Sequence, residues 1–315
     1  MEKANNYEKP MNIFEFQELF GTEEKCQEHL FNMRFKDGFE CPKCGCTHGY
    51  KISTRNSMKC SKCEYQLSAM AGTIFHNSKM PLVKWYLAIF FVTIDKRGIS
   101  ALQLQKEIGV TYKTAWYVNK RIREGMKNAD EKYKLDGTVV VDETYFSGIK
   151  QPSNTKKNKP KKRGRGTKKN KVIVALSVDK NGYPLYAKMT LVNNFRAVTI
   201  AKFAKKNIEK GATILTDGFN SYKSQKLKKD YFHEFENFDK DNENSTLKWI
   251  HKVISNAKAF INGTPHGVEK LELQKYLDEF CYRFNRRHIL KLIPEKLINS
   301  LLLAKHVNYY GEVMG

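Results

Sequence analysis

Two C-x-x-C pairs near the N-terminus constrain the fold of this chain more than any other feature. Cys41 and Cys44 form the first pair and Cys60 and Cys63 the second, with fifteen residues between the pairs. Paired cysteines at this separation are typical of a structural zinc site, in which each pair gives two thiolates to one tetrahedral ion. Four thiolates complete the coordination, so we expect this zinc to fold a small module and to take no part in catalysis.

Two alternatives stay open at this site. Cys46 and His48 lie close enough in the sequence to compete as ligands, although either would break the paired symmetry, and the cysteines could also be unrelated buried residues. The chain has seven cysteines, an odd number, and its N-terminus shows no apolar segment typical of a secretory signal. We therefore expect reduced, metal-binding thiols in a cytosol and not a disulfide framework.

The charge of the chain predicts a polyanionic partner. Its 315 residues include 56 lysines and arginines against 33 acidic residues, a net charge of +23. Basic side chains that neutralise phosphates release condensed counterions, so nucleic acid is the first partner to consider. An anionic membrane surface is the second. However, the longest apolar run, Trp85 to Ile94, has about half the length needed to cross a bilayer, and it predicts a buried helix.

Short β-branched runs alternate with helical stretches from about residue 137 to 262, which predicts an α/β domain. Three valines lead into Asp142, which we expect at the end of a buried strand, and a strand over Thr213–Thr216 leads into Asp217. Two further strands and a helix are expected between them. Acids that follow two neighbouring strands can converge on divalent ions, as two-metal phosphoryl transfer requires.

Each of these acids has a simpler alternative. Asp142 or Asp217 alone would most often be a cap or turn residue, and only the repeated pattern of strand and acid favours a site. Glu143 is a competing first acid. Successive strand residues point to opposite faces, so Asp142 and Glu143 cannot both reach one site if the strand continues, and Asp142 is our choice.

A helix beginning near Leu247 is predicted by apolar residues at helical spacing, which form one stripe: Leu247, Ile250, Ile254, Ala257 and Ile261. His251 and Lys258 are seven residues apart, so they nearly superpose on the flank of this stripe, where they can face a cleft. No acid lies between Thr246 and Val268. His251 is therefore either a metal ligand or a hydrogen-bonded histidine on a helix, and Lys258 either contacts phosphate or is solvated.

Residues Gly98 to Met126 predict a helix, a short turn and a second helix, the arrangement of a helix-turn-helix. Ser100 and Thr111 are the expected N-caps, and Leu102 and Ile108 would face a core. The second helix offers four basic residues to phosphates or base edges: Lys113, Lys120, Arg121 and Arg123. A helical hairpin with solvated lysines is the alternative.

The segment from Lys156 to Lys171 carries ten lysines and arginines and no acid. Such a run cannot bury a core, so it predicts an insertion between two strands. We expect it to bind DNA backbone without reading sequence, through residues that include Lys161, Lys162, Arg163 and Arg165. The alternative is that these charges only keep a loop solvated.

The chain resembles prokaryotic insertion-sequence transposases with an N-terminal zinc ribbon and an RNase H-like, DDE-type catalytic domain. The resemblance covers most of the chain and rests on "CPKC…CSKC", "VDETYFSG", "TDGFNSY" and "WIHKVISNAKAFINGTPHG" followed by "LQKYLDEFCYRFNRR". By motif match, the first two metal-binding acids are Asp142 and Asp217. The third position is His251 with Lys258 seven residues later, a DDH/K variant, and His266 and Glu269 are fallback ligands.

The resemblance implies an α/β fold class in which an RNase H-like mixed-sheet domain follows a zinc ribbon and a helix-turn-helix-like region. The expected limits are 11–75 for the ribbon, 79–130 for the helix-turn-helix-like region, 137–290 for the catalytic domain with a basic insertion at 151–171, and 291–315 for a C-terminal helical tail.

The implied activity is cleavage of double-stranded DNA at terminal inverted repeats and joining of the 3′ ends to target DNA. Two Mg²⁺ or Mn²⁺ ions are expected, with a preference shifted towards Mn²⁺ because imidazole is softer than oxygen. We expect a homodimer or higher oligomer on DNA, in the prokaryotic cytoplasm at the nucleoid and without a membrane. A catalytically inactive, domesticated DNA-binding regulator and an RNase H-like nuclease are the alternatives.

Overall fold

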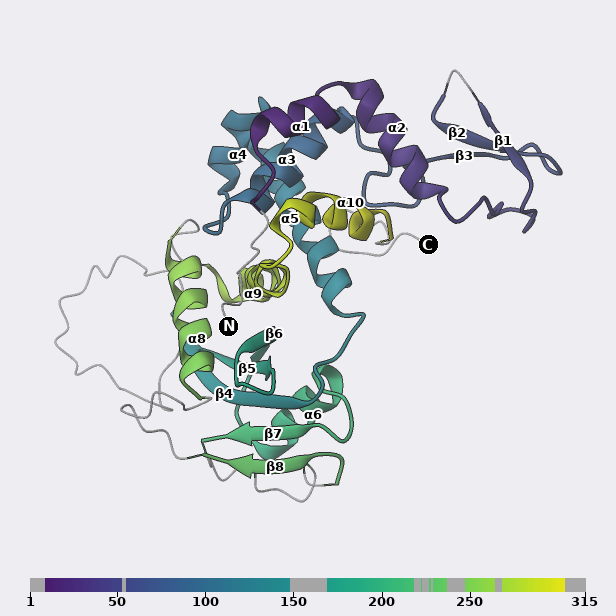
Figure 1. Cartoon of the computed structure of the whole chain (residues 1–315). Coiled ribbons are helices and arrows are strands. Elements are labelled where there is room, and N and C mark those ends of the chain that lie inside the picture. Colours follow the sequence, from purple (N-terminus) through teal and green to yellow (C-terminus); the bar gives the residue numbers. More distant parts are fainter. Residues whose placement is uncertain are drawn as a thin grey trace, which may run out of the picture. The chain divides into compact units, whose positions relative to one another are not determined.

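The computed structural model describes residues 9–52, 55–147, 169–217, 222, 227, 229–236, 247–263 and 268–303. The chain forms two compact units (Figure 1). The first combines the N-terminal segment up to Ala129 with the segment that starts at Arg286, and the second runs from Asp130 to Asn285. Among the described residues, no helix combines the length and the apolar character needed to span a bilayer.

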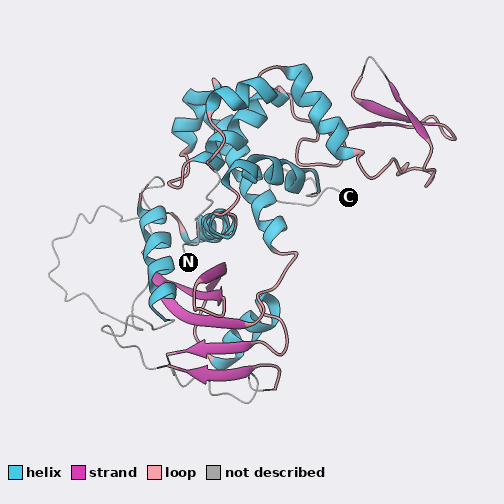
Figure 2. Cartoon of the chain, in the orientation of Figure 1, coloured by secondary structure: helices cyan, strands magenta, loops and turns pink. Residues whose placement is uncertain are grey.

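The first unit contains a three-stranded antiparallel sheet (Figure 2). Its strands are β1 (Gly49–Ile52), β2 (Ser57–Cys60) and β3 (Gln66–Ser68), paired in the order β1-β2-β3, and the first cysteine pair precedes β1 while the second lies at the end of β2 and just after it. Among the described residues, its buried core consists of Phe39, Cys41, Cys60 and Leu67, with partly buried side chains packed around them. So small a core cannot hold a sheet by apolar burial alone, which is the usual situation of a module folded by a metal.

Helices make up the rest of the first unit. They are α1 (Ile13–Phe20), α2 (Glu23–Arg34), α3 (Leu82–Ile94), α4 (Ala101–Ile108), α5 (Tyr112–Asp130), the short 3-10 helix η3 (Leu290–Leu292) and α10 (Ile293–Leu303). Helix α3 contains the apolar run of the sequence and is buried along most of its length. Helix α10 packs against α3. It also meets α5 so closely that a Cβ atom built on Gly125 would lie 2.2 Å from Leu301 Cδ2.

The expected caps of α4 and α5 are present. Ser100 Oγ accepts a hydrogen bond from the Gln103 N–H at 3.1 Å, and Thr111 Oγ1 accepts one from the Thr114 N–H at 3.2 Å. The expectation for Leu102 is wrong, because its side chain is 58% exposed whereas Leu104 is fully buried. Two residues turn a helix by about 200°, so Leu104 and Leu102 face opposite sides.

The second unit is built on a mixed five-stranded sheet. Its strands are β4 (Thr138–Phe146), β5 (Asn170–Val178), β6 (Pro184–Val192), β7 (Thr213–Thr216) and β8 (Phe232–Phe235), in the order β6-β5-β4-β7-β8. Strands β4, β5 and β6 are antiparallel neighbours, while β7 runs parallel to β4 and β8 parallel to β7. Helix α6 (Ala197–Asn207) lies between β6 and β7 in the chain. The structure thus confirms the expected α/β class and adds β8.

The two faces of this sheet are buried by different helices. Val140 of β4 belongs to the cluster formed with α8 (Leu247–Asn262) and α9 (Lys270–Asn285). Val139 and Val141 belong to the cluster on the other face, formed with α6. All five apolar residues of the expected α8 stripe are buried. In the following, these two sides are called the α8 face and the α6 face of the sheet.

Candidate active site

Asp142 lies in the middle of β4, not at its end, because the strand continues to Phe146. Asp217 directly follows β7, as expected. Val140 pairs with Leu215 in the parallel register of these strands, and continuing that register by two residues brings Asp142 level with Asp217. Residues two apart in a strand share a face, so both acids project from the α8 face, on strands about 4.8 Å apart.

His251 approaches this point from helix α8. Its Nε2 atom lies 3.4 Å from Asp142 Oδ2, and its side chain is 43% exposed against 20% for that of Asp142. The backbone N–H of Glu143 donates a 2.7 Å hydrogen bond to the Asp142 carboxylate and fixes its orientation. The buried stripe holds α8 on the sheet, while His251 on its flank reaches the acid.

Lys258, two turns further along α8, is also within electrostatic reach of Asp142. Burial lowers the pKa of its ammonium group, the charge of Asp142 opposes this shift, and the charge of Lys169 adds to it. Of the fallback ligands, Glu269 is exposed just before α9, where its backbone carbonyl accepts from the N–H groups of Glu272 and Leu273. His266 lies outside the described residues.

The geometry at Asp142 and His251 fits a hard divalent ion. Octahedral Mg²⁺ with ligands at about 2.1 Å places neighbouring ligand atoms about 3 Å apart, close to the observed 3.4 Å. Asp217 lies on the same face of the sheet, level with Asp142. However, its carboxylate does not form a group with Asp142 and His251 in which all ligand atoms lie within 4.8 Å of one another. Within the described residues, the only set of three or more such ligands whose atoms all lie within 4.8 Å is that of the four cysteines.

Glu143 points away from this site. Strand alternation places its side chain on the α6 face. There, in addition to burial, the charge of its carboxylate raises the pKa of the Tyr222 hydroxyl. The structure therefore separates Asp142 and Glu143 by the thickness of the sheet.

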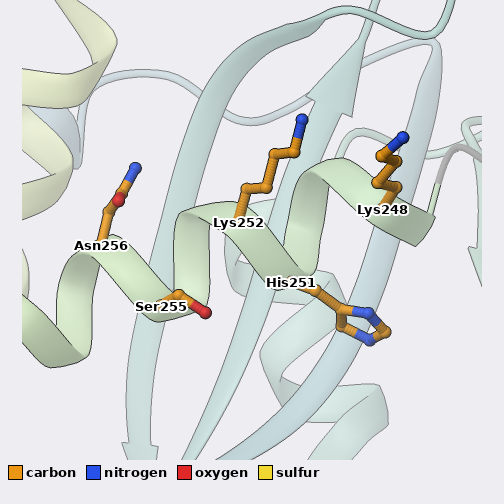
Figure 3. Close-up of a pocket in the computed structure, with 5 residues that line it drawn as sticks. All are labelled: Lys248, His251, Lys252, Ser255 and Asn256. Atoms are coloured by element: carbon orange, nitrogen blue, oxygen red, sulfur yellow. The ribbon is translucent and has the colours of Figure 1, made fainter. Parts of the chain in front are cut away.

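A hollow of about 410 Å³ runs along α8 beside His251 (Figure 3). The residues that line it are Lys248, His251, Lys252, Ser255 and Asn256. In Figure 3 the imidazole of His251 leaves the helix in a different direction from the ammonium groups of Lys248 and Lys252. Neither lysine was predicted as a site residue from the sequence. Lys248 lies three residues before His251 and Lys252 one residue after it, on a helix without acids. This spacing was the sequence signal that could have indicated them.

The four cysteines of the first unit converge. Cys41 Sγ lies 3.5 Å from Cys63 Sγ, and Cys44 Sγ lies 3.6 Å from Cys60 Sγ. Tetrahedral zinc with bonds of about 2.3 Å separates its sulfur ligands by about 3.8 Å, so the four thiolates fit this ion. Cys46 stays outside the group, with its Sγ 3.6 Å from the His48 carbonyl oxygen.

The surroundings of Cys41 favour its thiolate form. Burial would raise the pKa of the Cys41 thiol, but the N–H groups of Lys43 and Cys44, together with the neighbouring Cys63 and Cys44 thiols, outweigh it, and the pKa falls to about 7. Because zinc binds the deprotonated thiol, these donors prepare Cys41 for the metal, whereas the pKa of the Cys44 thiol is raised to about 12.

Helix α5 does not present all of its basic residues to solvent. Lys113 is exposed and Lys120 is half-buried, with its Nζ 5.4 Å from the Trp116 ring centroid. Arg121 and Arg123 are only 7% and 8% exposed, so the expectation that they are available to DNA is corrected.

Arg121 is buried because it binds groups inside the first unit. Its guanidinium group donates to the Ile74 carbonyl and stacks on the Tyr117 ring at 4.5 Å, so it stabilises the first unit from within. The four basic residues expected from the insertion, Lys161, Lys162, Arg163 and Arg165, lie outside the described residues.

Comparison with known proteins identifies both units. The transposase zinc-ribbon domain model matches residues 21–66, and the ISXO2-like transposase domain model matches residues 134–285. An uncharacterized protein in transposable element ISH50 of Halobacterium salinarum is 28% identical over 219 residues, which cover 64% of this chain and 70% of that protein.

Solved structures show weaker likeness. The catalytic domain of Mos1 mariner transposase matches with a TM-score of 0.27 and 14% identity over 60% of this chain and 95% of its own. The catalytic core domain of BIV integrase matches with a TM-score of 0.29 and 10% identity over 46% and 81% of the two chains. TM-scores this low do not identify the fold or the family of the chain.

The family models, the relative and the observed sheet agree with one another. A four-cysteine ribbon precedes an α/β domain with a mixed five-stranded sheet, in the order expected from the sequence. The chain therefore combines a transposase zinc-ribbon domain with an ISXO2-like transposase domain, the domain order of an insertion-sequence transposase.

Proposed function

We propose that this chain is a DNA transposase that binds the terminal inverted repeats of an insertion sequence, cuts the DNA there, and joins the 3′ ends to target DNA. The observation that carries the proposal is the contact between Asp142 and His251 at 3.4 Å, level with Asp217 on the neighbouring strand. Two strands and a helix thus carry the two carboxylates and the imidazole that would hold the ions. This donor set suits Mg²⁺ or Mn²⁺.

Asp142 is the shared ligand in this proposal, with His251 on one side of it and Asp217 on the other. Ions in two-metal sites are about 3.5–4 Å apart, so the outer ligands of such a pair need not approach each other closely. This explains why Asp217 and His251 can serve one site without forming a single tight group. When bound, the ions activate the attacking water or 3′-hydroxyl and stabilise the leaving oxygen.

Lys258 holds the DNA strand in this proposal. A protonated lysine cannot bind a metal, but it can contact a phosphate, and its electrostatic interaction with Asp142 supports a role beside the reacting bond. Burial and the nearby charge of Lys169 both destabilise the protonated form of this ammonium group. A bound phosphate would offset this effect. The hollow along α8 extends the basic surface through Lys248 and Lys252.

The remaining DNA contacts are proposed for the first unit and the insertion. Of the four basic residues predicted on α5, the exposed Lys113 and the half-buried Lys120 would contact DNA from the helix-turn-helix-like region 79–130. Lys161, Lys162, Arg163 and Arg165 of the basic insertion would bind backbone without reading sequence. The ribbon (11–75) would fold around zinc, the catalytic domain would span 137–290, and the tail (291–315) contributes α10 to the first unit. We propose a homodimer or higher oligomer on DNA in the prokaryotic cytoplasm.

A strand-transfer assay on element-end DNA with Mg²⁺ or Mn²⁺ tests the proposal. Asp217→Ala should abolish both cleavage and joining, whereas Asp136→Ala, an exposed acid just before β4, should leave both intact. Cleavage by the wild type without joining would make the chain a nuclease. DNA binding without any cleavage would make it a regulator, and either result would overturn the proposed activity.

A further inference from the structure

Four polar side chains lie on the α6 face, behind the two acids of the candidate active site. Glu143 follows Asp142 in β4, and Thr216 precedes Asp217 in β7. Because neighbouring strand residues point to opposite faces, Glu143 and Thr216 project to the side away from α8. Each of them is thus the sequence neighbour of a candidate metal ligand, but its side chain lies on the opposite face of the sheet.

Two aromatic residues connect them. His233 of β8 pairs with Ile214 of β7 and shares its face, and its Nε2 atom forms a 3.0 Å hydrogen bond with Thr216 Oγ1. The His233 ring stacks on Tyr222, with ring centroids 6.2 Å apart and planes inclined by 19°. Tyr222 follows Asp217 by five residues and is only 1% exposed.

Tyr222 completes the connection to β4. Burial raises the pKa of its hydroxyl well above the ordinary value, and the nearby charge of the Glu143 carboxylate raises it further. The charges of Asp142 and Asp217 add smaller contributions. The Tyr222 hydroxyl therefore lies within electrostatic reach of both acids, although it stands on the other side of the sheet.

These polar groups stand out against their surroundings. Tyr222 belongs to an otherwise largely aliphatic and aromatic cluster that includes Val139, Val141 and Ile214. Burying the phenol and partly burying the carboxylate and the imidazole there costs free energy that apolar residues of similar size would not cost. A connected polar network in an apolar core fixes one arrangement of the elements that carry it.

We propose that Glu143, Tyr222, His233 and Thr216 form a positioning network that sets the distance between Asp142 and Asp217. The inference rests on the proposed function, since it takes these two acids as the metal ligands. None of the four groups faces α8, so none is a catalytic residue. The network ties the residue after the first acid to the residue before the second, across β4, β7 and β8. Glu143 is then a positioning residue and not the first acid.

Manganese binding by the full-length, zinc-loaded protein tests the network directly. The loss of the free Mn²⁺ signal in electron paramagnetic resonance reports binding without DNA or turnover. Groups that orient metal ligands typically change metal affinity by about 10- to 100-fold. We expect Tyr222→Phe and Glu143→Ala each to raise the dissociation constant about tenfold. Glu143→Gln removes the charge but keeps the shape of the side chain, so its effect should be smaller.

Three further variants control the test. Tyr231→Phe removes a buried hydroxyl from the same cluster, where it donates to the Ile208 carbonyl at 3.4 Å, and should leave Mn²⁺ affinity unchanged. Thr216→Val, nearly isosteric, breaks the bond to His233 and should weaken binding even if Tyr222→Phe does not fold. The double variant Tyr222→Phe, Glu143→Ala should be no worse than either single one, because both break the same connection.

The outcomes separate this inference from the proposed function. Unchanged Mn²⁺ affinity in Tyr222→Phe and Thr216→Val, together with lost binding in Asp142→Asn, overturns the network and leaves the proposed function standing. Lost binding in Glu143→Ala with normal binding in Tyr222→Phe makes Glu143 a ligand and also overturns it. Normal binding in Asp142→Asn removes the metal site of the proposed function itself.

Discussion

The carboxylate of Asp142 and the imidazole of His251 lie 3.4 Å apart, one on a central strand and the other on a helix that packs against it. This contact predicts the outcome of exchanging the histidine. His251→Glu should support strand transfer with a preference shifted from Mn²⁺ towards Mg²⁺, because carboxylate oxygen is a harder ligand than imidazole nitrogen. His251→Ala should lower the rate by about 10- to 100-fold. Transfer rates with each metal measure both.

Ser255→Ala is the matched control, since Ser255 lines the same hollow one turn along α8. It should keep wild-type rates and metal preference. Wild-type transfer by His251→Ala would show that His251 is only a histidine on a helix surface.

Arg121 and Lys113 should respond differently to truncation. Arg121→Ala leaves the Ile74 carbonyl without its charged donor and should lower the free energy of unfolding by about 2 kcal/mol. Lys113→Ala, at an exposed position, should change that free energy by less than about 0.5 kcal/mol. It should instead reduce the slope of log affinity against log salt by about 0.9, the value for one lost phosphate contact. Denaturant unfolding and salt titrations of DNA binding distinguish the two roles.

Removing zinc should unfold the ribbon and leave the second unit folded. Among the described residues of the ribbon, four form its buried core and two of these are expected zinc ligands, so little holds it together without the metal. Cys41→Ser with Cys60→Ser should abolish zinc binding and make residues 39–68 exchange their amide hydrogens rapidly. Cys46→Ser should retain zinc, because Cys46 lies outside the four-sulfur group. Zinc content and hydrogen exchange check this, and a folded ribbon without metal would contradict it.

The basic insertion should contribute to DNA binding independently of sequence. Strand β5 begins at Asn170, so a replacement of the insertion that ends at Lys168 leaves the sheet intact. Replacing residues 156–168 by a glycine-serine linker of equal length removes eight positive charges. It should flatten the dependence of log affinity on log salt for both element and unrelated DNA. An unchanged slope would show that these charges only solvate a loop.

Local pattern in the sequence revealed most elements of the fold. The strand over Thr213–Thr216 and the buried stripe of α8 follow from periodicity alone, and the structure confirms both. Strand β8 escaped prediction because three of its four residues are exposed, so its sequence carries no buried alternation. Its pairing with β7 depends on contacts between distant segments, which local periodicity does not encode.

The candidate site shows the same division. Residue type and helical spacing singled out Asp142, Asp217, His251 and Lys258, but not that Asp142 lies in mid-strand or that Glu143 faces a buried tyrosine. The burial of Arg121 was missed for a related reason. A helix surface looks equally basic in the sequence whether a neighbouring loop covers it or not, and the Ile74 carbonyl that binds Arg121 comes from another segment.

The position of α10 imposes an order on biosynthesis. This helix fills the space beside Gly125 and packs on α3, yet the whole second unit is translated between these partners. The first unit cannot close until the ribosome has released residues 293–303, after the sheet of the second unit has emerged. A message truncated after Asn285 would therefore yield a complete sheet joined to an N-terminal unit with an open apolar flank, a target for chaperones and proteases before it could compete for DNA.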